Sequence, residues 1–304
     1  MRDMAGAVVV GYDGSASAVD ALEWAATEAV RSKARLVVLH ASDLALMLAP
    51  AGRPGWVGHV PDTLARDVTT DGAERARKLV RDLDVDAVTP VDSPAGALEQ
   101  ASRTAALVVV GNRGHGPVTG PLLSSVAYSV ATHAHCPVVV VRSQTPEGLA
   151  PDAPVVVGVD GSPGAEEALR FAARYALDTA SPLEVVTSWS MPAGDSWAAQ
   201  YWDSIAPEHE SHPVIEAAEQ VAAQSRERVL TEHPELPVEM RVLQGGPAQV
   251  LAGLSSGARL VVVGARGRGG FASLLLGSVS RGVIHLAHCP VTVVRAGGTP
   301  AEKG

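Results

Sequence analysis

The stretch VVVGVDGS at 155–162 repeats, with one exchange, the stretch VVVGYDGS at 8–15. Two further segments that follow the first stretch recur, in the same order, after the second stretch. The first pair is separated by 147 positions and the later pairs by 153, so the second repeat carries six extra residues between its start and its later segments. A repeat of this length predicts two tandem copies of one domain. The later segments are LVVVG at 107–111 and 260–264, and HCPV at 135–138 and 288–291.

The repeats set the expected domain boundaries. We expect copy one at 1–143 and copy two at 154–296. A stretch rich in proline and polar residues at 144–153 is the expected linker, and 297–304 the expected tail. Each copy is long enough to bury its own core.

Within each copy, short valine-rich runs alternate with helical stretches. Runs without polar alternation are typical of strands buried on both faces, as in parallel sheets. Ser15 or Ser17 can cap the first helix, and Ser162 the equivalent helix, where Pro163 suits the first turn. We therefore expect an α/β fold of two tandem doubly wound, Rossmann-like parallel five-stranded sheets with helices on both faces, which bind ligands at the carboxyl ends of their strands. The expected strands are 7–12, 35–41, 85–91, 107–111 and 137–142 in copy one, and 154–159, 183–189, 238–243, 260–264 and 290–295 in copy two.

The bulk composition narrows the classes of function. The formal net charge of -9 argues against nucleic acid and anionic membrane as partners, because both require a basic face. No signal-peptide pattern and no apolar run long enough for a membrane span occur, and the two cysteines have no metal-binding spacing. We expect a cytoplasmic protein.

The strongest motif in copy two is Gly264-Ala265-Arg266-Gly267, followed after nine residues by Gly277-Ser278. Glycines let backbone amides approach an anion closely, and a helix that begins at 277–278 would point free N–H groups at a phosphate. A plain glycine-rich loop is the alternative. Asp160 ends the first strand at the same expected sheet edge, where it can meet a ribose hydroxyl or a metal on the phosphates, or cap a helix.

These segments resemble the universal stress protein family, in particular VVVGVDGS at 155–162, LVVVGARGRGG at 260–270 and LLLGSVSRGVIHLAHCPVTVVR at 274–295. The resemblance covers nearly the whole chain. It implies strand order 3-2-1-4-5 and ATP, accompanied by Mg²⁺, lying across strands one and four and held by the G-x2-G-x9-[GS]-S loop. It also implies a nucleotide-dependent regulator in stress rather than an enzyme. The residues that it assigns to ATP in copy two are Gly158, Asp160, Ser188, Gly264, Ala265, Arg266, Gly267, Arg268, Gly269, Gly277, Ser278, Val279 and Ser280.

Copy one departs from the pattern, because Ser124 replaces the third glycine. A side chain there can clash with the ligand or shift the backbone, so we expect copy two to bind ATP more tightly. The alternative functions are a slow ATP hydrolase and a pseudo-dimer in which only copy two binds nucleotide. The expected ATP-binding residues of copy one are Gly11, Asp13, Ala41, Gly111, Arg113, Gly114, His115, Gly116, Ser124, Ser125 and Val126.

Other features suggest partners or further sites. The apolar fifth strands, 137–142 and 290–295, lie at a sheet edge in the strand order that the resemblance implies, and an unprotected apolar edge invites pairing. In the family this edge makes the dimer, so the resemblance implies an intramolecular pseudo-dimer of the two copies. A homodimer and an unknown protein partner are further expectations. The two His-rich segments could be metal sites or ordinary helix ends. We favour helix ends, and we therefore expect no metal held by the protein alone. Trp189, Trp197 and Trp202 could form a flap over the nucleotide or simply pack a long loop. The His-rich segments comprise His133, His135 and Cys136, and His285, His288 and Cys289.

Overall fold

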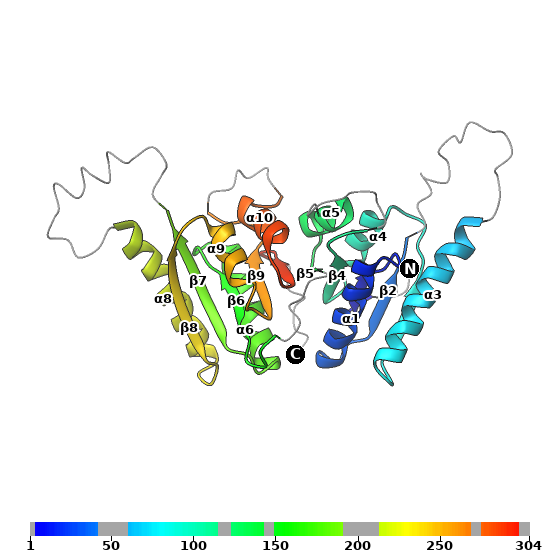
Figure 1. Cartoon of the computed structure of the whole chain (residues 1–304), viewed down its shortest axis with the longest axis horizontal. Coiled ribbons are helices and arrows are strands. Elements are labelled where there is room, and N and C mark those ends of the chain that lie inside the picture. Colours follow the sequence, from blue (N-terminus) through cyan, green and yellow to red (C-terminus); the bar gives the residue numbers. More distant parts are fainter. Residues whose placement is uncertain are drawn as a thin grey trace, which may run out of the picture. The chain divides into compact units, whose positions relative to one another are not determined.

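The computed structural model describes residues 4–41, 60–114, 123–142, 149–190, 213–268 and 275–297 (Figure 1). Contacts divide the chain into two compact units. The first comprises Met1–Glu147 together with Cys289–Gly304, and the second Gly148–His288. In the part of the chain that is described, no helix has the length and apolar character that crossing a bilayer requires.

The first unit contains a parallel sheet in the order β3-β2-β1-β4-β5, as expected for copy one. A sixth strand, β10, joins β5 in antiparallel direction, with Val291 opposite Val140. The elements are β1 (Val8–Gly11), α1 (Ala16–Arg31), β2 (Leu36–Leu39), α3 (Val60–Leu79), β3 (Val85–Val88), α4 (Pro94–Ala101), β4 (Leu107–Gly111), α5 (Ser125–His133), β5 (Val138–Val141) and β10 (Val291–Val294).

The second unit repeats the β3-β2-β1-β4 part of this plan, with the parallel order β8-β7-β6-β9. The doubly wound α/β fold expected from the sequence is therefore confirmed. The elements are β6 (Val155–Gly158), α6 (Pro163–Asp178), β7 (Leu183–Trp189), α8 (Pro213–Glu232), β8 (Val238–Gln244), α9 (Pro247–Leu254), β9 (Leu260–Gly264) and α10 (Ser278–Leu286).

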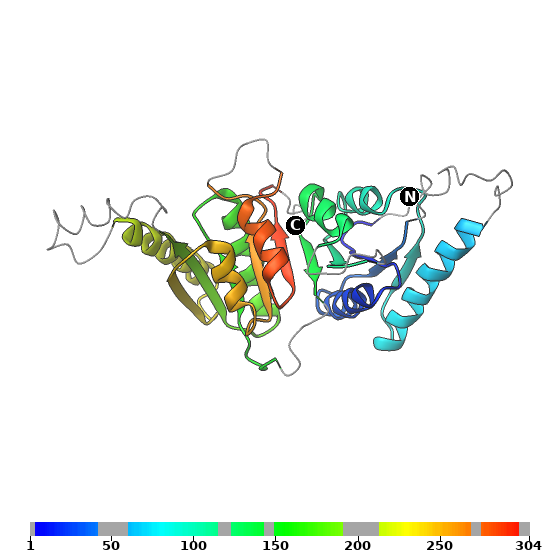
Figure 2. The same ribbon diagram turned by 45° about the horizontal axis from the view of Figure 1, so that its top comes forward.

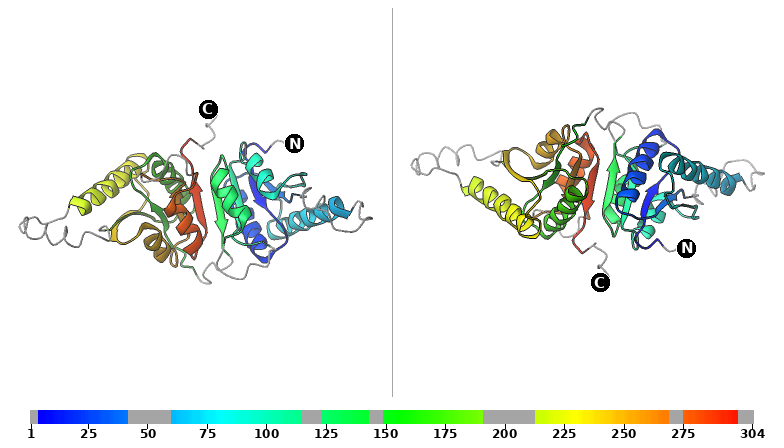
Figure 3. Two further views of the ribbon diagram at one scale, coloured as in Figure 1. Left: turned by 90° about the horizontal axis from the view of Figure 1, so that it is seen from above. Right: turned by 90° about the horizontal axis from the view of Figure 1, so that it is seen from below.

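Helices cover both faces of each sheet (Figures 2 and 3). In the first unit α1 contacts α3, and α4 contacts α5; in the second, α6 contacts α8, and α9 contacts α10. The central strands are consequently buried on both faces, and Val9, Val108 and Val261 have no exposed surface. This burial is the reason that valine runs without alternation form the sheets.

The helix caps agree with the sequence in part. Ser15 caps α1 by accepting a hydrogen bond from the Ala18 amide at 3.2 Å, and Ser162 caps α6 with Pro163 in its first turn. Ser17 is no cap: its buried hydroxyl donates to Asn112 Oδ1 at 3.0 Å. The third strand is shorter than expected, ending at Val88, because Pro90 has no N–H for the ladder.

Candidate functional site

A pocket of about 480 Å³ opens at the carboxyl ends of β6 and β9. These strands are parallel neighbours, with Val157 opposite Val262, so the residues after both reach the same edge of the sheet. Most residues predicted for copy two line this pocket. They are Gly158, Asp160, Ser188, Gly264, Arg266, Gly267, Arg268, Gly277, Ser278, Val279 and Ser280.

Two predicted residues of copy two do not line the pocket. Ala265 is buried, and its carbonyl accepts hydrogen bonds from the Gly277 amide at 2.8 Å and the Ser280 hydroxyl at 3.1 Å. It thus joins the motif loop to the start of α10. Gly269 lies outside the described residues.

The carboxylate of Asp160 connects the end of β6 to the motif loop. Its Oδ1 accepts from the Ser162 amide at 3.0 Å, and its Oδ2 accepts from the Arg268 amide at 2.9 Å. The cap of α6 is Ser162, so the interpretation of Asp160 as a helix cap is wrong. Asp160 instead holds the loop in place at the edge of the pocket.

The first two motif glycines are required by contacts within the protein. A Cβ on Gly264 would lie 2.6 Å from the carbonyl carbon of Gly164, where α6 begins. A Cβ on Gly267 would lie 2.3 Å from Asp160 Oδ2. Any side chain at either position would have to displace the backbone or the carboxylate.

The third glycine has a different role. A Cβ on Gly277 would meet the Ala265 carbonyl oxygen at 3.4 Å, which is ordinary contact. Gly277 is the N-cap of α10, and because glycine has no side chain, it makes no capping hydrogen bond to the first turn of this helix. The Ser280 hydroxyl donates to backbone carbonyls rather than capping. The amides of this turn are therefore available to an anion in the pocket, and the helix dipole favours one.

An apolar wall of this pocket was missed by the sequence analysis. Pro247, Val250 and Leu251 of α9 contribute it, and the two glycines before α9 were the signal that this helix begins at the site. The other lining residues that were missed are Val159, Ala165, Val186, Thr187 and Val263.

The equivalent pocket in copy one has a volume of about 140 Å³. Ser125 does not line it, and His115 and Gly116 lie outside the described residues. The predicted residues that do line it are Gly11, Asp13, Ala41, Gly111, Arg113, Gly114, Ser124 and Val126. The lining residues that were missed are Tyr12, Ala18, Leu39, His40, Pro94, Leu98, Val110 and Ala127.

Of the two effects considered for the Ser124 side chain, a clash with the ligand or a shift of the backbone, the backbone shift does not occur. Ser124 has φ −63° and ψ 149°, and Gly277 has φ −74° and ψ 162°. Both amides bond to the motif loop, Ser124 N to the Asn112 carbonyl at 2.9 Å and Gly277 N to that of Ala265 at 2.8 Å. The difference lies in the side chain: Ser124 Oγ accepts from the Ala127 amide at 3.1 Å, so α5 is capped and α10 is not.

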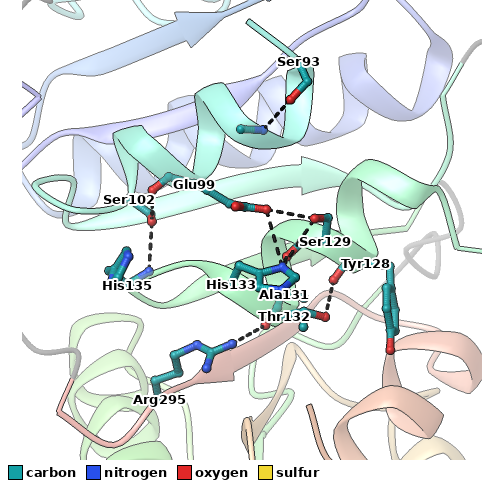
Figure 4. A network of polar contacts seen from close by, with 11 residues as sticks. Ser93, Glu99, Ser102, Tyr128, Ser129, Ala131, Thr132, His133, His135 and Arg295 are labelled. Carbon is teal, nitrogen blue, oxygen red and sulfur yellow. Dashed lines mark hydrogen bonds and ion pairs between the residues drawn. The ribbon is translucent and has the colours of Figure 1, made fainter. Parts of the chain in front are cut away.

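The His-rich segment of copy one is a helix end, as the sequence analysis favoured (Figure 4). His133 Nδ1 lies 2.9 Å from the Ser129 carbonyl oxygen, within α5, and the His135 amide donates to Ser102 Oγ at 2.9 Å. Burial raises the pKa of Cys136 to about 12. In the residues that the structure describes, no three His, Cys, Asp or Glu side chains are grouped as metal ligands.

The corresponding segment of copy two has the same backbone arrangement, since the His288 amide donates to Ser255 Oγ at 2.8 Å. Trp189 is the last residue of β7. The other two tryptophans of the expected flap, Trp197 and Trp202, lie outside the described residues.

Comparisons with known proteins agree with this architecture. Residues 4–142 and 153–295 each match the model of the universal stress protein family. Universal stress protein Rv2005c of Mycobacterium tuberculosis is 34% identical over 302 residues, covering 95% of this chain and 96% of the relative. Universal stress protein Rv2623 of the same organism is 36% identical over 299 residues, with the same coverage.

A solved structure has the same fold. The crystal structure of a universal stress protein from Archaeoglobus fulgidus is similar with a TM-score of 0.67 and 19% identity, covering 96% of each chain. The family model matches both repeats, and the relatives extend over nearly the entire sequence. The chain belongs to the universal stress protein family.

Proposed function

We propose that this chain is an ATP-binding stress-response protein of the cytoplasm, a nucleotide-dependent regulator that holds ATP in the pocket of each copy. The observation that carries the proposal is the pocket of copy two, in which uncapped amides of α10, two arginines and an apolar wall face one cavity. Its volume of about 480 Å³ lies within the range of small-molecule sites.

The lining fits the parts of a nucleotide. The α10 amides and the exposed Arg266 and Arg268 suit the phosphates. Val250 and Leu251 offer apolar surface for a base, and Ser188 lines the same pocket. Mg²⁺ would accompany the phosphates and neutralise part of their charge; we assign it no ligand set made of protein alone.

The hydrogen bonds of Asp160, the acidic residue that lines this pocket, favour ATP binding over ATP hydrolysis. Both oxygens of Asp160 already accept backbone N–H bonds, an arrangement suited to holding the motif loop rather than to orienting a water. ATP would then act by stabilising one conformation, which a protein partner could recognise.

We propose unequal sites, with copy two the tighter. The Ser124 hydroxyl accepts a hydrogen bond from one amide at the start of α5, whereas the corresponding cap residue of α10, Gly277, has no side chain to do so. A ligand in copy one therefore has one donor fewer, and the pocket there has the smaller volume. The cause is hydrogen-bond competition rather than a displaced backbone.

One experiment tests the proposal directly. Nucleotide is extracted from the purified chain, identified and quantified per chain, and thermal melting is recorded with ATP, with and without magnesium. We expect intact ATP at one or two molecules per chain, and stabilisation by about 2.7 kcal/mol at a hundredfold excess over the dissociation constant. The absence of any melting shift with adenine nucleotides at millimolar concentration would refute binding, and recovery of ADP alone would favour hydrolysis.

A further inference from the structure

Tyr12 links the pocket of copy one to helix α3. It stands between two residues of that site, Gly11 and Asp13, and itself lines the pocket. Its side chain is buried, and its hydroxyl donates to Asp71 Oδ2 on α3 at 2.8 Å. The same oxygen accepts from Arg75 Nε at 2.7 Å. A short chain of hydrogen bonds therefore runs from the end of β1 to the exposed side of α3.

The packing around Tyr12 leaves little freedom. A Cβ on Gly72 of α3 would lie 2.7 Å from Tyr12 Cδ1, so the helix backbone lies directly against the ring. The Tyr12 amide donates to the Leu39 carbonyl at 2.9 Å, and its carbonyl oxygen lies 2.8 Å from His40 Nδ1. A shift of the backbone at Asp13 would therefore be transmitted to α3 through a rigid side chain.

The protonation states support this link. Burial, and then the hydrogen bond to Asp71, raise the pKa of Tyr12 to about 12. The hydrogen bonds from Arg75 and from Tyr12 lower the pKa of Asp71. At neutral pH the phenol is a donor and the carboxylate an acceptor, as the geometry requires.

Copy two lacks this link. Val159 replaces Tyr12, and it borders a hollow of about 60 Å³ that extends to α8. The helix residues at the positions of Asp71 and Gly72 are Gln224 and Ser225, which line the same hollow. The counterpart of Arg75 is Arg228, which pairs with Glu166 on α6.

We propose that Tyr12 is a positioning residue that couples nucleotide binding in copy one to α3, a coupling absent from copy two. This inference rests on the proposed function, because it requires a nucleotide in the first pocket. Coupling of this kind is reciprocal: ATP in copy one protects α3 from opening, and breaking the link weakens ATP binding in copy one. The loss of one hydrogen bond predicts an affinity lower by about two- to tenfold.

Hydrogen exchange by mass spectrometry on the full chain, with and without saturating ATP, tests the coupling. Peptides over 107–114 and 124–133 report occupation of the first pocket, and peptides over 65–79 report α3. In the unaltered chain we expect ATP to protect both sets. In Tyr12→Phe, which retains the ring, we expect the first set to respond and α3 to lose its response.

Matched variants separate coupling from simple loss of stability. Asp71→Asn retains an oxygen that can accept from Tyr12 and should retain the α3 response, whereas Asp71→Leu has similar size, lacks an acceptor and should lose it. A purely structural Tyr12 would lower the melting temperature in Tyr12→Phe and leave the ATP-dependent difference at α3 unchanged, which would overturn the inference.

The remaining outcomes are also decisive. Protection of the first pocket without protection of α3 in the unaltered chain would overturn the inference, as would ATP protection confined to the motif of copy two, 260–268 and 277–286. A chain without protection at either motif would instead contradict the proposed function, so the two failures are distinguishable.

Discussion

Asp160 Oδ2 occupies the space that a side chain at position 267 would need, since a Cβ on Gly267 would lie only 2.3 Å away. The same oxygen accepts a hydrogen bond from the Arg268 amide at 2.9 Å. The position of the Asp160 carboxylate therefore requires a glycine at 267. The motif loop can approach the end of β6 only because position 267 has no side chain.

Gly267→Ala should therefore destabilise the chain and weaken ATP binding in copy two. Overpacking of this kind costs about 1–3 kcal/mol. Gly114→Ala is the matched control, because a Cβ there would lie 3.1 Å from Asp13 Oδ2 and needs only a small displacement. Urea unfolding and titration calorimetry would measure both effects; equal losses in the two variants would contradict this account.

The capping difference makes a prediction about the two sites. Gly277→Ser should place a hydroxyl on the first turn of α10, as Ser124 does on α5, and reduce the tighter ATP affinity about ten- to a hundredfold. Gly277→Ala adds a Cβ without a cap and should lose less. Gly277→Val should abolish most tight binding, because a branched side chain crowds the pocket. Titration calorimetry measures the ATP affinities of the three variants. If Gly277→Ala binds ATP as weakly as Gly277→Ser, the added Cβ rather than the hydroxyl is the cause of the loss.

The converse change concerns copy one. Ser124→Gly removes the hydroxyl that now accepts from the Ala127 amide, and it should strengthen the weaker ATP-binding step while leaving the tighter step unchanged. Ser124→Ala provides the control for loss of the cap alone, which costs about 1 kcal/mol of helix stability. If Ser124→Gly weakens binding, the ranking of the two sites is wrong.

A buried hydroxyl in β10 predicts a stabilising substitution. Thr292 has no exposed surface, and its Oγ1 has no hydrogen-bond partner among the residues that the structure describes. Thr292→Val should raise the free energy of unfolding by about 1–3 kcal/mol, the cost of an unsatisfied buried polar group. Thr187→Val is the matched control, because Thr187 Oγ1 donates to the Val159 carbonyl at 3.2 Å, and it should destabilise the chain. Denaturant unfolding of the ligand-free variants measures both.

Tyr12 predicts a specific dependence of stability on alkaline pH. Its pKa is raised from 10.0 to about 12 in the folded chain, so the folded state favours the protonated phenol. The resulting stabilisation is complete below pH 10 and is lost as the pH rises toward 12. The difference in unfolding free energy between the unaltered chain and Tyr12→Phe should therefore shrink between pH 10 and 12, and a constant difference would show that the phenol does not contribute in this way.

Much of the candidate site could be predicted because it follows from local sequence and strand order. Gly264 ends a strand that was predicted as a buried valine run, and Asp160 follows another closely; parallel neighbours bring such residues to one edge of the sheet. The two glycines before α9 indicate where this helix begins, but they do not show that Val250 and Leu251 form a wall of the pocket, because these two residues resemble ordinary core residues until the helix is placed. The hydrogen bond by which Ser124 caps α5 could not be predicted either, since the side chain of a serine before a helix can cap the helix or point elsewhere.

The sequence by itself determined the two copies, their α/β class and the motif positions, since repeats, valine-rich runs and turn glycines are local signals. Only the tertiary structure decided why the glycines are needed and how the copies differ. Gly264 and Gly267 are required by atoms of Gly164 and Asp160, about a hundred residues away in the chain. Tyr12 reaches Asp71 on α3, whereas Val159 faces a hollow beside α8. Such contacts join residues that are far apart in the sequence, and they form only when packing brings the two elements together. No local pattern of residues therefore indicates them.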